Sequence, residues 1–209
     1  MLQDCRCISC ESFSQFDLPP LTNTIGYCAI AATAGDSDEG HRSDPGSLVA
    51  FVENKVHHGH LDGIVLCACA AAHLARNEIY RNGSHGIVAA SGAWPTIVNN
   101  TIFSNLCNGI LLVNEAGGIV QGNTIYKQGK NGIVAKWCTT TSLVANEVYE
   151  NRRCGVRVSH DLLIDVLQNE VRNNAICGIW IKVRFYLVTV PFCANPANNL
   201  TWSPSYISI

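Results

Sequence analysis

Apolar and polar positions recur every 23 residues along most of this chain. An asparagine opens each repeat, an isoleucine or valine stands two positions later, and a glycine followed by another isoleucine or valine comes nine positions after the asparagine. The asparagines are Asn54, Asn77, Asn100, Asn123, Asn146 and Asn169, and the glycines are Gly63, Gly86, Gly109, Gly132, Gly155 and Gly178. Such a fixed period, kept over six units without an insertion, indicates a repeat architecture.

The length of the repeat restricts the fold. Helix-pair repeats need about 33 to 47 residues, and leucine-rich repeats need an L-x-x-L-x-L pattern that is absent here. Pairs such as Ile110 and Leu112 alternate with the period of two that is typical of strands. The sequence therefore predicts an all-β fold, a right-handed single-stranded parallel β-helix of about six to seven coils of 23 residues.

Two amide columns fit this prediction. The second column comprises Asn82, Asn105, Gln128, Asn151 and Asn174, with Gly59 in the first unit. Asparagine tolerates the left-handed conformation at a bend, and amides stacked coil on coil can bond one another as a structural ladder. The glycine column indicates a turn that needs either positive φ or close backbone approach.

The repeat defines three segments of the chain. Residues 47–182 follow it. Residues 1–46 lie outside it and comprise a polar, turn-rich linker over 35–46, preceded by a possible irregular first coil over 21–34. In the divergent tail, 183–209, the register fails, since Phe192 and Thr201 occupy the expected amide and glycine positions. This tail either caps the last coil or replaces the end of a truncated rod.

Composition excludes several classes of function. The 209 residues carry a net charge of -2, which does not favour nucleic-acid binding. No apolar run approaches the roughly 18 residues of a membrane span. The first residues lack the basic and apolar regions of a secretory signal, so we expect a cytoplasmic protein.

The eleven cysteines are odd in number, which fits a disulfide framework poorly. We expect most of them to be reduced and to pack as small apolar side chains. Cys5, Cys7 and Cys10 form a cluster with zinc-ligand spacing, but no second ligand pair follows. The sequence therefore predicts no metal or cofactor there.

Three histidines, His57, His58 and His60, stand close together at a turn of the first coil. Imidazoles in such a group can bind a transition metal. No carboxylate column joins them, however, and a solvated turn explains them more simply, so we again expect no metal.

Carboxylates are sparse on the predicted outer faces. Glu147 and Glu170 would lie one coil apart, as a β-helix enzyme acting on polysaccharides would need, but a solvated face explains them equally well. Asp62, Asp161 and Asp165 are scattered in turns and form no matching cluster. A polysaccharide lyase or glycoside hydrolase therefore remains the alternative function.

One outward column is aromatic. It contains His57, Tyr80, Phe103, Tyr126, Tyr149 and Arg172, each three positions after a ladder asparagine. The column can serve as a partner surface, because tyrosine and arginine are favoured at binding hot spots, or it can stabilise the rod by stacking. Arg157 and Trp180, in another outward column, would extend a binding surface.

The segments 77–87, 123–133 and 146–156 share the core N-x-[IV]-Y followed by G-[IV]. In these features and in its period the chain resembles the β-helix region of the F-box only proteins. That resemblance implies a part in protein ubiquitination, in which the F-box joins a cullin-based ligase and the β-helix presents substrates. The sequence contains no F-box, so contact with the ligase adaptor would need a segment missing from this chain, which would then be a fragment or a short isoform.

The resulting expectation is a non-catalytic β-helix that binds proteins, in the substrate-recruiting region of a ubiquitin ligase, without catalytic residues, cofactors, nucleic acid or a membrane span. The candidate protein-binding residues are Tyr80, Phe103, Tyr126, Tyr149, Arg157, Arg172 and Trp180.

Overall fold

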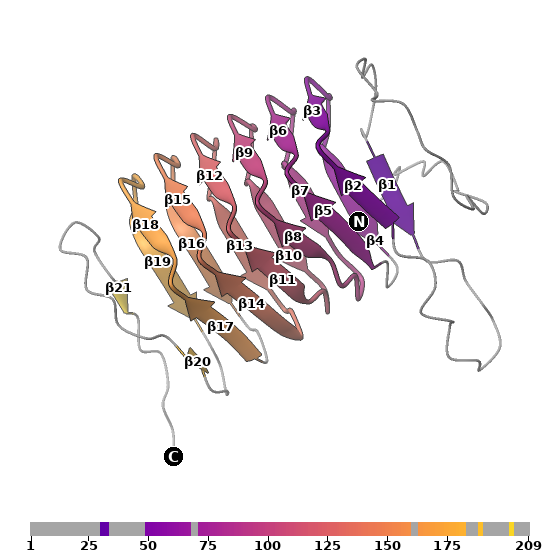
Figure 1. Cartoon of the computed structure of the whole chain (residues 1–209). Coiled ribbons are helices and arrows are strands. Elements are labelled where there is room, and N and C mark those ends of the chain that lie inside the picture. Colours follow the sequence, from indigo (N-terminus) through magenta and orange to yellow (C-terminus); the bar gives the residue numbers. More distant parts are fainter. Residues whose placement is uncertain are drawn as a thin grey trace, which may run out of the picture.

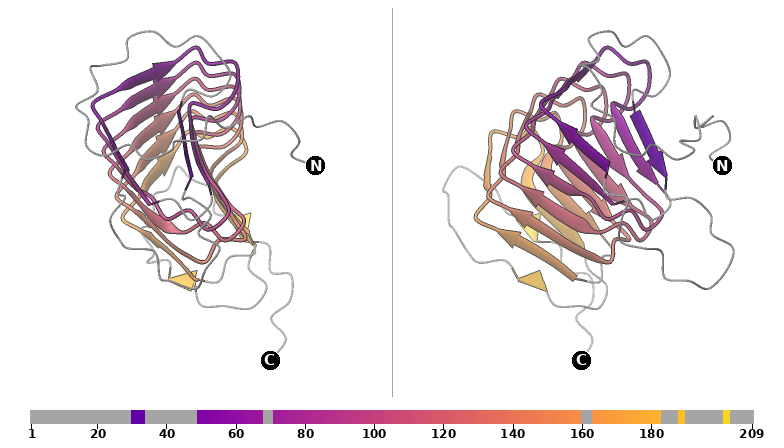
Figure 2. Two further views of the ribbon diagram at one scale, coloured as in Figure 1. Left: turned by 90° about the vertical axis from the view of Figure 1, so that its right-hand side faces the viewer. Right: turned by 45° about the vertical axis from the view of Figure 1, so that its right-hand side comes forward.

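The computed structural model describes residues 30–33, 49–67, 71–159, 163–182, 188–189 and 201–202. Within these ranges the regular elements are all β-strands, arranged as a rod of stacked coils (Figure 1). Viewed nearly along the rod, successive coils superpose (Figure 2). The prediction of an all-β, right-handed β-helix is thus confirmed.

Each regular coil gives one strand to each of three parallel sheets. Sheet A contains β1 (Ile30–Thr33), β4 (Ile64–Cys67), β7 (Ile87–Ala89), β10 (Ile110–Val113), β13 (Ile133–Lys136), β16 (Cys154–Ser159), β19 (Cys177–Lys182) and β21 (Thr201–Trp202). Sheet B contains β2 (Val49–Val52), β5 (Ala72–Ala75), β8 (Thr96–Val98), β11 (Gly118–Gln121), β14 (Thr140–Val144), β17 (Leu163–Leu167) and β20 (Val188–Thr189). Sheet C contains β3 (Lys55–His57), β6 (Glu78–Tyr80), β9 (Thr101–Phe103), β12 (Thr124–Tyr126), β15 (Glu147–Tyr149) and β18 (Glu170–Arg172).

The strand register follows the sequence period. Ile125 pairs with Ile102 on one side and with Val148 on the other, each 23 residues away. All three side chains are fully buried, because the middle residue of every sheet C strand points into the rod. Aliphatic side chains from the three sheets fill the interior, so each coil buries its apolar face against its neighbours.

The first amide column forms a continuous ladder inside one corner of the rod. From Asn54 to Asn146, each asparagine Nδ2 donates to the Oδ1 of the asparagine in the next coil, at 2.9 to 3.1 Å. The same oxygen accepts the backbone N–H of the preceding rung, as Asn123 Oδ1 does from Asn100 at 2.8 Å. The ladder therefore satisfies backbone groups that the bend between sheets B and C would otherwise leave buried and unpaired.

The left-handed residues are not the ladder amides themselves, which corrects the role expected for asparagine at these bends. Positive φ falls on the residue before each amide, for example Arg76 (54°) before Asn77 and Ala145 (51°) before Asn146. Side chains as different as arginine and alanine occupy this position, so the local sequence does not identify it. The amide supplies the hydrogen bonds, and the residue before it makes the turn.

The glycine column is explained by close approach between coils. A Cβ placed on Gly132 would lie 2.7 Å from the carbonyl oxygen of Gly155 and about as close to the side chain of Val148. Gly86 and Gly109 meet the same obstacles from the coils that follow them. Of the two reasons considered for these glycines, close backbone approach applies, because no described glycine of this column has positive φ.

Short strands from outside the regular repeat continue the sheets at both ends of the rod. β1 pairs with β4, β20 pairs with β17, and β21 pairs with β19. The Cys5, Cys7 and Cys10 cluster, the linker over 35–46 and most of the tail lie outside the described residues. In the part of the chain that the structure describes, no helix is long and apolar enough to cross a membrane.

Candidate functional site

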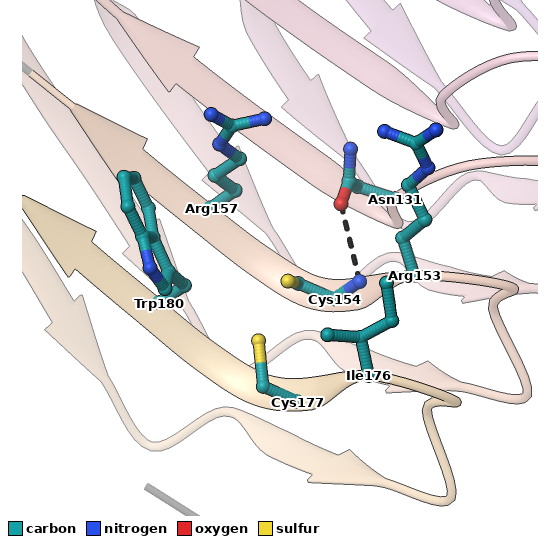
Figure 3. Close-up of a pocket in the computed structure, with 7 residues that line it drawn as sticks. All are labelled: Asn131, Arg153, Cys154, Arg157, Ile176, Cys177 and Trp180. Atoms are coloured by element: carbon teal, nitrogen blue, oxygen red, sulfur yellow. Dashed lines mark hydrogen bonds between the residues drawn. The ribbon is translucent and has the colours of Figure 1, made fainter. Parts of the chain in front are cut away.

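A surface pocket of about 310 Å³ lies over the outer face of sheet A in the last two regular coils (Figure 3). Strands β16 and β19 and the turns leading into them supply most of its walls. We call it the basic pocket, and it is lined by Asn131, Arg153, Cys154, Arg157, Ile176, Cys177 and Trp180.

The basic pocket arises where an outward column of sheet A changes character. In the first four regular coils that column is aliphatic, comprising Val65, Val88, Leu111 and Val134. The next two coils place Arg157 and then Trp180 in the same register. The Arg157 guanidinium carbon lies 4.8 Å from the centre of the Trp180 ring, so cation and ring are held together on neighbouring strands.

The charge of this pocket is not compensated within the described chain. The described part of the chain forms five ion pairs, all on other parts of the surface. None of them includes Arg153 or Arg157. None of the seven lining residues is acidic. Both guanidiniums are solvent-exposed, so they present planar, charged donor groups to a ligand.

A third polar row, which was not predicted from the sequence, leads into the pocket. It consists of the residues immediately before the column glycines, Asp62, His85, Asn108 and Asn131. Their bonds run in the opposite sense to the first ladder, with each N–H donating to the side chain of the preceding coil. The row ends where Asn131 Oδ1 accepts the Cys154 N–H at 3.1 Å (Figure 3). The sequence signal for this row was a polar residue immediately before each of four successive column glycines.

The charged form of His85 is disfavoured in this row. Burial lowers the pKa of its imidazole, the nearby Asp62 carboxylate opposes that shift, and Lys130 reinforces it. The backbone N–H of Asn108 donates to His85 Nδ1 at 3.2 Å, so this nitrogen carries no proton. His85 Nδ1 therefore acts as a hydrogen-bond acceptor within the third polar row, and in the neutral imidazole Nε2 carries the proton.

The aromatic column lies on sheet C, away from the basic pocket. Its rings stack in parallel, with centroids 4.7 Å apart for Tyr80 and Phe103, 5.2 Å for Phe103 and Tyr126, and 5.1 Å for Tyr126 and Tyr149. Arg172 covers the last ring at 4.1 Å. The faces of these rings are thus occupied by one another, and the candidate residues divide between two separate surfaces.

The possible catalytic carboxylates are already engaged. Glu147 and Glu170 both pair with Arg172, the latter at 2.9 Å. Asp165 lies alone in an outward column of sheet B, and Asp161 lies outside the described residues. Within the described ranges no three metal-binding side chains come together.

Comparison with known proteins identifies the fold and enzymes that share it. A family model for the right-handed β-helix region matches residues 40–185. No curated protein sequence matches the chain. A mutant of the periplasmic alginate epimerase AlgG is similar in structure, with a TM-score of 0.62 and 26% identity over 65% of this chain and 33% of that one. The AlgE4 A-module of the Azotobacter vinelandii mannuronan C-5 epimerase gives a TM-score of 0.53 and 22% identity over 61% and 36% of the two chains.

These findings correct the expected function. The chain spans about a third of the length of the epimerase structures that it resembles. No matching protein supports assignment to the F-box only proteins, and the similar structures are of carbohydrate enzymes. The expectation of a non-catalytic, substrate-recruiting part of a ubiquitin ligase is therefore wrong, and the alternative of a carbohydrate-active enzyme is favoured. The described rings of the aromatic column stack on one another, whereas Arg153 and Arg157 of the basic pocket take part in none of the described ion pairs.

Proposed function

The chain belongs to the right-handed β-helix family, and from this premise we propose that it is part of a carbohydrate-active enzyme that binds an anionic polysaccharide at the basic pocket. The observation that carries this proposal is the pair of uncompensated guanidiniums, Arg153 and Arg157, beside Trp180. The similar AlgG structure supports it, since it is of an enzyme named for alginate, a polymer of uronic acids.

The arginines suit the carboxylate of a uronic acid. A guanidinium is a planar fork of donors that matches a carboxylate, and such charge-assisted bonds are stronger than neutral ones. A flexible surface salt bridge is worth little, but here two cations flank one hollow and none of its lining residues is an acid that would compete. An acidic sugar residue would therefore bind better here than a neutral one.

Trp180 gives the pocket its second feature. A sugar ring carries C–H groups that pack against an aromatic surface, while its hydroxyls remain free to bond elsewhere. Trp180 is half-buried on β19, and Arg157 lies over its ring at 4.8 Å, which restricts the ring before a ligand arrives. A sugar would pack against the part of the ring that Arg157 leaves uncovered. Fixing the ring in advance reduces the entropy lost on binding.

The same arginines would assist a reaction at C-5 of a uronic acid. Removing the proton from C-5 leaves negative charge that spreads into the adjoining carboxylate. Preorganised cations at that carboxylate stabilise the charge as it develops, which is commonly the largest single contribution to such catalysis. We assign this stabilising role to Arg157 and Arg153; the base that takes the C-5 proton and the acid that returns it on the other face would have to come from outside the basic pocket, whose lining supplies neither.

The test replaces Arg157 with valine, the residue that Val134 supplies at the same position one coil earlier. We expect the parent chain to bind polymannuronate and polygalacturonate but not neutral dextran. The variant should bind at least about tenfold more weakly, in line with the loss of a charged hydrogen bond. Calorimetry gives the affinities, and uptake of deuterium at C-5, followed by NMR, gives the activity.

The matched control is Arg152→Ala. It removes the neighbouring arginine, which does not line the pocket, and follows Ala175, its equivalent in the next coil. Equal loss of binding in both variants would indicate a general charge effect and contradict a specific site. Equal affinity of the parent for dextran and for polyuronates would also overturn the proposal.

A further inference from the structure

Two histidine rings meet at the first bend after strand β3, at the opposite end of the rod from the basic pocket. His57 Nδ1 and His58 Nδ1 lie 2.8 Å apart, and the rings are nearly perpendicular, with centroids 5.0 Å apart. At this distance the two nitrogens form a hydrogen bond at a partly exposed site, so one Nδ1 carries the proton that the other accepts, and a metal ion would have to replace that proton.

The backbone explains how consecutive side chains come together. Neighbouring residues of a strand point to opposite faces, so their rings would normally diverge. His58 adopts the left-handed conformation, with φ of 56°, and this turns its ring back toward that of His57. The equivalent residues of later coils, such as Arg81 and Lys127, adopt the same backbone conformation, but the residue before them is a tyrosine.

The distance between the nitrogens corresponds to a particular coordination geometry. Imidazole nitrogen binds a divalent metal at about 2.0–2.1 Å, so two nitrogens 2.8 Å apart subtend an angle of about 90° at a shared ion. A tetrahedral ion would need the nitrogens farther apart, whereas tetragonal ions such as Ni²⁺ and Cu²⁺ take adjacent ligands at this angle. We propose, in place of the metal-free turn expected from the sequence, that His57 and His58 chelate a divalent transition-metal ion of this tetragonal class.

The surroundings hold one ligand and leave room for the others. His57 stacks on Tyr80 with a centroid distance of 4.8 Å and an angle of 21°, so the aromatic column fixes its ring. His58 is exposed, and water can complete the coordination there. The nearest cation on the same strand, Lys55, is paired with Glu78 at 3.3 Å. The proposed site uses two protein ligands only.

The experiment uses the untagged full chain and Ni²⁺, which does not oxidise thiols as Cu²⁺ does. The variants come from the repeat itself: His57→Phe follows Phe103 and preserves the ring stack, and His58→Lys follows Lys127 and preserves the turn. Calorimetry should detect one Ni²⁺ site in the parent beyond any that the thiols provide. Each variant should weaken Ni²⁺ binding at that site about tenfold or more. In NMR spectra Ni²⁺ should broaden the His57 and His58 imidazole signals first.

The control is His60→Ala, which follows Ala175 and removes a nearby histidine that the proposed site does not use. All variants keep the eleven cysteines, so Ni²⁺ bound by thiols is common to every titration. The proposal is overturned if His57→Phe and His58→Lys bind Ni²⁺ as tightly as the parent. It is equally overturned if His60→Ala loses the ion to the same extent. Neither result affects the basic pocket.

Discussion

The outer faces of sheets C and A carry aromatic residues in contrasting ways. On sheet C a ring follows a ring in four successive coils, and each covers the faces of its neighbours. On sheet A a single tryptophan, Trp180, follows Arg157 at the end of an aliphatic column, and a pocket opens beside them. Where one side-chain type repeats, the side chains pack against one another from coil to coil. Where the column changes residue type, as at Arg157 and Trp180, side chains remain available to a ligand.

Charges show the same contrast. On sheet C, Arg172 lies between Glu147 and Glu170 and also covers Tyr149, so its charge is locally balanced. On sheet A, Arg157 lies over the ring of Trp180 and takes part in no ion pair within the described ranges. The two arginines occupy neighbouring coils of one rod, yet one stabilises a column and the other lines the basic pocket.

The largest expected loss of stability comes from breaking the first amide ladder, on which the folding of both faces depends. In Asn123→Leu the interior rung loses its bonds to Ile97 O at 2.9 Å and to the rungs on either side. The change leaves buried donors and acceptors without partners, at roughly 1–3 kcal/mol each, so we expect a loss of about 3–6 kcal/mol. The midpoint of urea unfolding measures it, and binding at the pocket should fail together with the fold.

The control for this prediction is Asn54→Leu at the first rung. Asn54 is only half-buried and bonds to Asn77 on one side of the ladder. The substitution should therefore cost clearly less than that of Asn123. Equal losses at the two rungs would show that the ladder is not the main source of stability at this corner.

Smaller losses of stability and binding distinguish the aromatic column on sheet C from the basic pocket on sheet A. Tyr126→Val removes ring contacts with Phe103 and Tyr149, at about 0.5–1.5 kcal/mol each, so unfolding stability should fall by about 1–3 kcal/mol. Binding of polyuronate should not change. Trp180→Val, which copies Val134, should do the reverse, weakening binding several-fold with a smaller loss of stability. Urea unfolding and calorimetry on both variants test the pair, and a loss of binding in Tyr126→Val would contradict the division between the faces.

The regular part of the molecule was predictable because every coil repeats the same physical problem. Ile125 must point inward in the same way as Ile102, so spacing alone predicts both the register and the core. The pocket was not predictable as a site, since Arg157 and Trp180 are single departures from a column and their meaning depends on the three-dimensional register. The left-handed position before each ladder amide was missed because no residue type marks it.

The third polar row offers the finest test, because His85 is ionisable whereas Asn108 and Asn131, which follow it in the row, are amides. The pKa of His85 is lowered from 6.5 by burial, so in acid the unfolded chain takes up this proton before the folded chain does. Stability must then decline as pH falls from the ordinary value of a histidine through the lower pKa of the folded state. His85→Asn, which copies Asn108 and Asn131, should remove this part of the decline and leave stability near neutrality almost unchanged. Urea midpoints at about pH 7.5 and about pH 5.5 measure the difference.

His73→Thr, which follows Thr96 on sheet B, controls for the loss of a histidine outside the row. If His85→Asn declines in acid as steeply as the parent, burial does not lower the pKa of His85 in the folded chain, and the acid sensitivity of the rod arises elsewhere.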